Sequence, residues 1–300
     1  MNSFLSYLQP FLRVFAFFGC YIFLTGFSAA MLVPFLSGID FSQTDPSALA
    51  SMQSDPALLL LMQLASLIGF LFTLFVFSKL PPRKDYIQFG LIDHRVIKDL
   101  GLGTAIGTGV ILLSFLILWL SGTVGNLQLN GDMSLRLLVV WFGIYLIVAF
   151  VEEVMFRGYF LNVFMDRYTP LTSVLITSIL FGSMHFLNPS FGWLGLVNIT
   201  LAGVLIGLTY FIRKTIWLPL GIHFGWNFVQ GTVLGFHVSG LEADAVFRHE
   251  LSDNALLSGG AFGLEGSLVT TLVCLIVIGL VYFYGKLNFR PLEFNEYESD

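Results

Sequence analysis

Long apolar runs separated by short polar segments dominate this chain of 300 residues. An apolar stretch of about 20 residues is long enough to cross a bilayer as an α-helix. Eight stretches meet or approach this length, and we expect a helix in each: 11–36, 57–78, 99–121, 134–165, 170–187, 191–212, 215–236 and 263–285. The pattern therefore predicts an all-α fold, a polytopic transmembrane helical bundle of about eight spans.

Composition supports the same class of protein. Hydrophobic residues make up 56% of the chain and charged residues 11%, with a mean hydropathy of +0.84, whereas soluble domains carry about 25% charged residues. The net charge of -5 is small and spread out, so it indicates no nucleic-acid partner. No soluble part stands out. We expect residues 1–300 to form a single integral-membrane domain with the lipid bilayer as a partner.

Basic residues orient the expected spans. When both termini are placed in the cytosol, most of the 14 Lys and Arg residues fall on the cytosolic side. These are Arg13, Lys79, Arg83, Lys84, Arg95, Lys98, Arg167, Arg213, Lys214, Lys286 and Arg290. Only Arg136 and Arg248 fall on the opposite side, and Arg157 lies within an apolar run. Cytoplasmic loops carry an excess of Lys and Arg, so we expect an integral protein of the cell membrane with both termini cytosolic.

Three charged side chains interrupt the stretch 134–165. Residues 150–159 read FVEEVMFRGY and include Glu152, Glu153 and Arg157. A charge at the centre of a bilayer costs at least about 2.5 kcal/mol, so such residues are functional candidates. Glu153 and Arg157 are four residues apart, so in a helix they share a face and can pair. Glu152 points about 100° away and is free for another partner.

Two later stretches carry polar side chains in apolar surroundings. His185 occurs in LFGSMHF, and His223 and Asn227 lie four residues apart in LGIHFGWNF. At about 1.5 Å of helix rise per residue, these groups and the glutamates can lie at the same depth in the membrane, nearer the cytosolic side. A packing contact is the simpler interpretation of any one group alone. Three groups at compatible depth favour one shared site, with a catalytic core within about 134–236.

The chemistry of these side chains suits the hydrolysis of an amide. A carboxylate held near an imidazole can take a proton from water, and an Asn amide or a protonated His can stabilise an oxyanion. Two His and a Glu can also bind zinc and leave a position for water, which makes Glu152, His185 and His223 candidate zinc ligands. The chain lacks the H-E-x-x-H and G-x-S-x-G motifs of other hydrolases.

The order of the motifs resembles the CPBP family of CAAX proteases and bacteriocin-processing enzymes, which includes the type II CAAX prenyl endopeptidases and the Abi-like proteins. The family motifs E-E-x-x-x-R, F-x-x-x-H and H-x-x-x-N read here EEVMFR (152–157), FGSMH (181–185) and HFGWN (223–227). The resemblance covers about 76 residues. It implies an α-helical intramembrane endopeptidase, metallo- or glutamate-dependent, whose site opens toward the cytosol.

By this resemblance, Glu152 with His185 would activate water, and His223 with Asn227 would hold the oxyanion. Glu153 and Arg157 would stabilise the helix as a buried ion pair. The family has also been described as metal-dependent, with Glu and His as zinc ligands, so zinc is a candidate cofactor. The sequence leaves the zinc and the metal-free mechanisms open, because the same residues serve both.

The expected partner is a membrane-associated peptide or protein substrate, prenylated or leader-bearing, that enters from the cytosolic side. Two other functions use similar residues. One is a non-catalytic immunity or scaffold protein of the same fold, and retention of every motif position favours the enzyme over it. The other is an ion or proton transporter, which would also use buried Glu and His. We rank the transporter lower, because the expected spans show no inverted-repeat symmetry.

Overall fold

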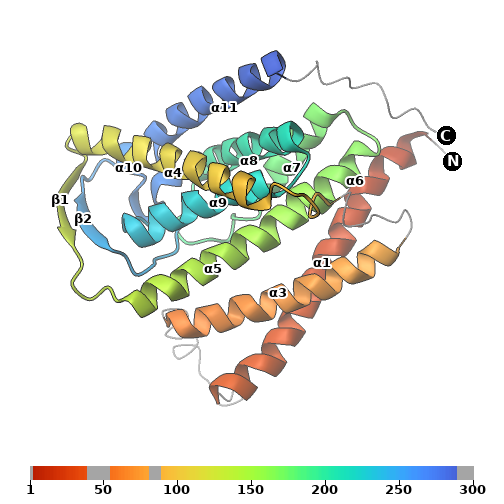
Figure 1. The fold of residues 1–300 in the computed structure, drawn as a ribbon, viewed down its shortest axis with the longest axis horizontal. Helices are drawn as coiled ribbons and strands as arrows, with labels where there is room; N and C mark the ends of the chain where they lie inside the picture. Colours follow the sequence, from red (N-terminus) through yellow and green to blue (C-terminus); the bar gives the residue numbers. More distant parts are fainter. Residues whose placement is uncertain (1–2, 39–54, 81–88, 289–300) are drawn as a thin grey trace.

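The computed structural model describes residues 3–38, 55–80 and 89–288, and it is built mainly of helices (Figure 1). The α-helices are, in chain order, α1 (Ser3–Ser37), α3 (Pro56–Lys79), α4 (Val96–Leu120), α5 (Leu135–Glu153), α6 (Leu161–Met165), α7 (Pro170–Ser183), α8 (Trp193–Arg213), α9 (Trp217–Phe228), α10 (Ala255–Ser258) and α11 (Leu268–Asn288). Two π-helical segments, η2 (Val154–Phe160) and η3 (Val229–Val233), continue α5 and α9. Two 3-10 turns, η4 (Gly260–Phe262) and η5 (Leu264–Gly266), precede α11.

Each of the eight expected stretches contains a helix, so the predicted fold class is confirmed. Within the described residues, six helical segments are long and apolar enough to cross a membrane: Ser6–Ser37, Pro56–Lys79, Val96–Leu120, Leu135–Met165, Trp193–Arg213 and Leu268–Lys286. Helices α7 and α9 are shorter than expected, at 14 and 12 residues. At about 1.5 Å per residue, neither reaches the roughly 30 Å of a hydrocarbon core.

Polar residues mark the starts of several helices. The side chains of Asp55, Ser134 and Thr169 accept hydrogen bonds from backbone N–H groups in the first turns of α3, α5 and α7. Proline follows the first and the last of these caps, where its missing N–H costs nothing. These caps satisfy backbone donors that have no partner inside the helix.

Small residues set the closest helix contact, between α4 and α9. A Cβ atom at Gly103 or Gly107 would collide with the backbone of α9, at the carbonyl oxygens of Leu218 and Ile222. The G-x-x-x-G spacing of these two glycines thus lets the two helices approach closely. Close packing of α4 on α9 holds in place the helix that carries His223.

The helices α1 and α3 pack on each other and, on their other side, against α5 and α6 (Figure 1). Aromatic rings fill this contact: Phe17 of α1 stacks on Tyr159 of η2 with ring centroids 4.5 Å apart, and meets Phe77 of α3 edge-on at 5.0 Å. All three rings are buried. This layer covers one side of the long helix that carries the two glutamates.

A two-stranded antiparallel sheet closes one end of the bundle. Strand β1 (Val124–Leu129) pairs with β2 (Phe247–Leu251), and Val124 lies opposite Leu251. Figure 1 shows both strands at the left end of the view, away from the start of α1. The sequence did not predict this sheet, because each strand is short and its partner lies more than a hundred residues away along the chain.

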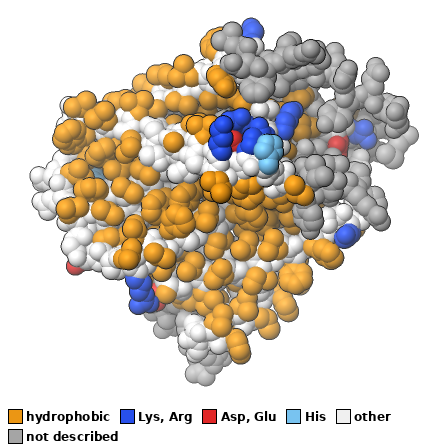
Figure 2. Space-filling view, in the orientation of Figure 1, with side chains coloured by type: hydrophobic (Ala, Val, Ile, Leu, Met, Phe, Trp, Pro, Cys, Tyr) orange, Lys and Arg blue, Asp and Glu red, His pale blue; other side chains and the backbone are white. Residues whose placement is uncertain are grey.

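The outer surface is strongly apolar. Large side chains on the membrane helices are widely exposed, among them Leu12 (68%), Phe23 (70%) and Leu280 (64%), and Figure 2 shows hydrophobic side chains over most of one face. Soluble monomers rarely show contiguous apolar patches of this extent. The exposed residues are therefore the expected lipid contacts of an integral membrane protein.

Basic side chains gather in a small area of the same view (Figure 2). Arg95 donates to the backbone carbonyl of Arg213, whose own guanidinium pairs with Asp99 at 3.2 Å. These residues lie at the starts of α4 and α9 and the end of α8, which is the end of the bundle away from β1 and β2. Three basic residues used in the orientation argument, at positions 83, 84 and 290, lie outside the described residues.

Cysteine labelling checks this orientation. With the partly buried Cys20 replaced by Ala and the buried Cys274 retained, a new cysteine at Arg167 should react with an impermeant thiol reagent only from the cytosolic side. A cysteine at Asp132, beside β1, should react only from the opposite side. The positive-inside rule is the reason for this expectation. If the cysteine at Arg167 reacted only from the outside and the cysteine at Asp132 only from the cytosol, the protein would have the opposite orientation in the membrane.

Candidate active site

The two motif glutamates lie at the end of α5, where the helix changes its winding. Glu152 and Glu153 are the last two residues of α5, and the π-helix η2 begins at Val154. Single-turn π-helical segments are rare and often occur at functional sites. The wider turn carries Arg157, and the chain returns to α-helical winding in α6.

Glu153 and Arg157 form a buried ion pair, as their spacing predicted. Arg157 Nη1 donates to Glu153 Oε1 at 2.8 Å, and the side chains are 2% and 0% exposed. Arg157 Nη2 also donates to the backbone carbonyl of Gly203 in α8, at 3.0 Å. The guanidinium carbon lies 4.8 Å from the ring centroid of Phe181 in α7. Arg157 therefore ties three helices together at the site.

His223 lies beside both glutamates. Its Nδ1 is 2.7 Å from Glu153 Oε1, and its Nε2 is 3.8 Å from Glu152 Oε2. Because Glu153 Oε1 also accepts from Arg157, the carboxylate is an acceptor, so His223 Nδ1 carries the proton and donates. Its Nε2 is then left facing Glu152. The sequence did not foresee that the third motif would contact both carboxylates of the first.

His185 lies in a turn rather than in a helix. The expected helix 170–187 ends at Ser183, because Asn188 precedes Pro189 and that position disfavours helical backbone. His185 Nδ1 donates to the carbonyl oxygen of Phe181 at 3.0 Å, which leaves Nε2 as an acceptor in the neutral ring. The helix rise used for the depth of His185 therefore applies only as far as Ser183, and the depth itself stays a prediction.

Phe181 joins the three motifs through its ring. The ring centroid is 5.3 Å from that of His185 and 5.8 Å from that of His223. The Arg157 guanidinium approaches the same ring. The phenylalanine of the F-x-x-x-H pattern thus contacts both imidazoles. The sequence analysis had given it no role.

The Asn227 carboxamide has no hydrogen-bond partner among the described residues. It lies one turn after His223 in α9 and is 8% exposed. No described residue makes a hydrogen bond to its carboxamide. Its two N–H donors are therefore available to a ligand in the space that it faces.

One large cavity brings the predicted residues together. Its volume is about 1000 Å³, and Glu152, His185, His223 and Asn227 all line it. Glu153 and Arg157 do not line the cavity; they support the His223 side chain from within the bundle. Four of the six candidate residues thus face one space, and the other two lie directly behind it.

The cavity extends away from the basic end of the bundle. Its lining includes Leu59 in the first turn of α3, residues 238–244 after η3, and Trp141 in the first half of α5. Leu241, at its rim, is 57% exposed. The rim thus lies at the end of the cavity away from the basic residues. These residues do not assign a side of the membrane, so the expected cytosolic opening stays a prediction.

Residues 134–229 match the family model of the Rce1-like type II CAAX prenyl endopeptidases. These residues form a Rce1-like domain. The Rce1-like domain begins at the cap of α5, ends at the first residue of η3 and contains all three motifs. A search of curated proteins found no match to the chain.

The residues of the Rce1-like domain were tested for a metal site. Within the described part of the chain, no group of three His, Cys, Asp or Glu side chains is placed to hold one metal ion. The ring of Phe181 packs against both imidazoles of the expected ligand set. This arrangement does not form the three-ligand zinc site, and zinc binding stays a prediction.

Glu265, outside the Rce1-like domain, is a cavity residue that sequence reasoning missed. It lies in η5 and is 4% exposed. Its carboxylate accepts hydrogen bonds from Gln230 Nε2 at 2.7 Å, Ser239 N at 2.9 Å and Trp226 Nε1 at 3.3 Å. Burial raises the pKa of this carboxyl, and the hydrogen bonds oppose that effect. Its only signal in the sequence is a single acid between glycines before an apolar run.

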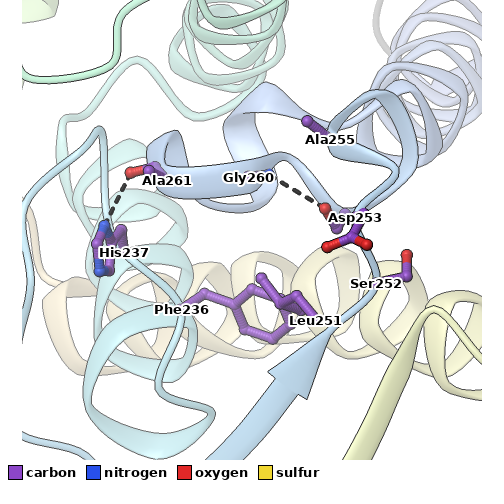
Figure 3. Close-up of a pocket in the computed structure, with 9 residues that line it drawn as sticks. Phe236, His237, Leu251, Ser252, Asp253, Ala255, Gly260 and Ala261 are labelled. Atoms are coloured by element: carbon purple, nitrogen blue, oxygen red, sulfur yellow. Dashed lines mark hydrogen bonds between the residues drawn. The ribbon is translucent and has the colours of Figure 1, made fainter.

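A second, smaller cavity lies apart from the Rce1-like domain, between the chain after η3 and the segment 251–261 (Figure 3). Its volume is about 360 Å³. His237 lines it, and its Nδ1 donates to the carbonyl of Ala261 at 2.8 Å. Asp253 is the acidic residue of this lining. The sequence analysis assigned His237 no role, and this single bond to the backbone gives it a structural one.

Proposed function

We propose that this chain is an intramembrane endopeptidase that hydrolyses a peptide bond of a membrane-associated substrate. One observation carries the proposal: Glu152, His185, His223 and Asn227 face a single cavity of about 1000 Å³. Membership of residues 134–229 in a CAAX prenyl endopeptidase family supports the same reaction class. The cavity is lined mainly by membrane helices, so the peptide bond reaches it at the level of the bilayer.

Glu152 is the proposed base that activates water. Its side chain is 29% exposed and lines the cavity, and it has no basic partner of the kind that Glu153 has in Arg157. It is therefore free to take a proton from a water molecule that attacks the substrate carbonyl. The Nε2 lone pair of His185 faces the same cavity and assists in holding that water.

Asn227 is the proposed donor to the oxyanion of the tetrahedral intermediate. Its unpartnered carboxamide is already held in the cavity wall, so little reorganisation is needed when negative charge develops. His223 Nε2 adds a second donor when it carries a proton. Glu152 then returns the proton taken from water to the amine that leaves, which balances the reaction.

Glu153 and Arg157 are positioning residues in this scheme. Glu153 fixes the tautomer and orientation of His223 through the 2.7 Å bond to Nδ1, and Arg157 holds Glu153. A second residue that orients a histidine is a recurrent feature of hydrolytic sites. Neither side chain needs to touch the substrate.

A path from the lipid supports a membrane-anchored substrate. Met62 of α3 and Met184 after α7 both line the cavity, and they are 40% and 42% exposed. The cavity wall thus reaches the lipid-facing surface on these helices. A prenylated or otherwise anchored peptide can pass its reacting segment inward while its apolar part stays in the bilayer.

Peptide cleavage in liposomes tests the proposed function. The purified chain should cleave a farnesylated peptide that ends in a CAAX sequence, as detected by the mass of the products. Because no three-ligand metal site forms among the described residues, we expect cleavage to persist in excess chelator. Less than one zinc per chain by elemental analysis would agree with that result. One zinc per chain, lost in His185→Ala together with activity, would establish the zinc mechanism instead.

A further inference from the structure

The large cavity carries acidic side chains and no basic ones. Its described lining contains Glu152, Glu242, Asp244 and Glu265, and it contains no Lys or Arg. Two of these acids, at positions 242 and 244, lie together in the segment after η3, at the end of the cavity away from the basic patch. The described rim of the cavity therefore carries only acidic charge, while the imidazoles of His185 and His223 lie deeper, beside Glu152.

The two acids at the rim are held differently. Asp244 Oδ2 accepts from Trp141 Nε1 at 3.0 Å, which ties the segment 238–244 to α5. Glu242 is exposed and lines the cavity. Among the residues that the structure describes, no Lys or Arg pairs with either carboxylate. Their charge is therefore directed to whatever enters the rim.

A second observation, at Asn227, shows that the cavity can make hydrogen bonds to a polar chain. The Asn227 side chain is more than nine-tenths buried, faces the cavity and has no hydrogen-bond partner among the described residues. The amide atoms reach the cavity space, so they can make hydrogen bonds with a chain that enters it. A peptide backbone in the cavity would supply the missing partner.

Accepting the proposed function, we infer that the substrate presents a positively charged peptide segment to Glu242 and Asp244. Field lines are focused in a cleft lined by one sign of charge, so a cationic segment is attracted and an anionic one is repelled. The cavity thus selects peptides with Lys or Arg beside the cleavage site, approaching from the face that carries β1 and β2.

Peptide binding to an inactive variant tests this inference separately from catalysis. Three fluorescent farnesylated peptides of equal length would carry two Lys, two Gln or two Glu residues at matched positions beside the modified cysteine. Their affinities would be measured by anisotropy on Glu152→Gln protein in lipid nanodiscs. We expect the Lys peptide to bind at least about tenfold more tightly than the Glu peptide in low salt, and the ratio to shrink in high salt.

Charge-reversal variants identify the residues responsible. Added to Glu152→Gln, Glu242→Lys should abolish or reverse the preference for the Lys peptide. The matched control is Glu250→Lys, which reverses an exposed charge in β2, outside the cavity lining, and should leave the preference intact. Asp244→Asn keeps an acceptor for Trp141 and should weaken the preference without unfolding the segment.

Each outcome has a clear consequence. Equal affinity for the three peptides, no saturable binding of any of them, or a preference that survives Glu242→Lys would overturn the inference. A preference for the Lys peptide in a wild-type protein that cleaves none of them would retain the inference. That result would remove the proposed function, because the chain would then bind basic membrane peptides without hydrolysing them.

Discussion

Replacing Glu152 with glutamine is expected to lower the rate of peptide cleavage by at least about 10²-fold, because general base catalysis contributes roughly 10²–10⁴-fold. Glutamine keeps the size of the side chain and removes its ability to take a proton. Glu152 faces the cavity, and His223 Nε2 lies 3.8 Å from its carboxylate. The fold should survive, since the change leaves no buried cation without a partner.

The measurement is kcat on a cleaved farnesylated peptide, together with the melting temperature in detergent. Glu250→Gln is the matched control, because Glu250 is an exposed carboxylate in β2 that bonds Asn126 and lies outside the cavity. The control should retain full activity. If Glu152→Gln loses less than about tenfold in kcat, Glu152 is not the base. If it loses activity and also melts early, the loss reflects folding.

The Arg157→Ala variant is expected to lose about 3–5 kcal/mol of unfolding free energy, the usual cost of removing one partner of a buried ion pair. Glu153 is 0% exposed, so its carboxylate would be left buried with only His223 as a partner. The carbonyl of Gly203 would also lose its donor. For a domain of ordinary stability, about 5–15 kcal/mol in total, this loss should reduce the yield of folded protein sharply.

Arg248→Ala provides the comparison, because it breaks the Arg248–Asp132 pair of 2.8 Å, whose side chains are 65% and 81% exposed. Exposed pairs contribute about 0–1 kcal/mol, so this variant should melt close to the wild type. Combining Arg157→Ala with Glu153→Gln should recover part of the lost stability, since no buried charge is then stranded. Normal abundance and an unchanged melting temperature for Arg157→Ala alone would contradict the buried-pair argument.

Apolar length and helical spacing determined much of this protein from its sequence alone. Runs of about 20 apolar residues have few structures available in a bilayer, because every backbone group must find its partner within the segment or a closed barrel. The helical bundle followed from that constraint. The pairing of Glu153 with Arg157 followed from a separation of four residues, which places both side chains on one helix face.

Contacts between helices could not be read from the same pattern. Periodicity shows which residues of one helix share a face, but it does not give the depth, rotation or neighbours of that helix. The sequence therefore did not predict that His223 contacts both Glu152 and Glu153. It also did not predict that α7 ends at Ser183, which places His185 in a turn. The π-helical winding after Glu153 was equally hidden, since it depends on the packing of Arg157 across three helices.

The acidic rim of the cavity could likewise be found only in the tertiary structure. Glu242 and Glu265 each look like ordinary residues of an extramembrane segment or a helix start in the sequence. Only the fold brings residues 238–244 and η5 against α5, α7 and α9, because these contacts join positions far apart in the chain. The sequence by itself determined the membrane helices and the residue types of the site. Tertiary packing decided which of those residues share a cavity, its sign of charge and the end of the bundle toward which it opens.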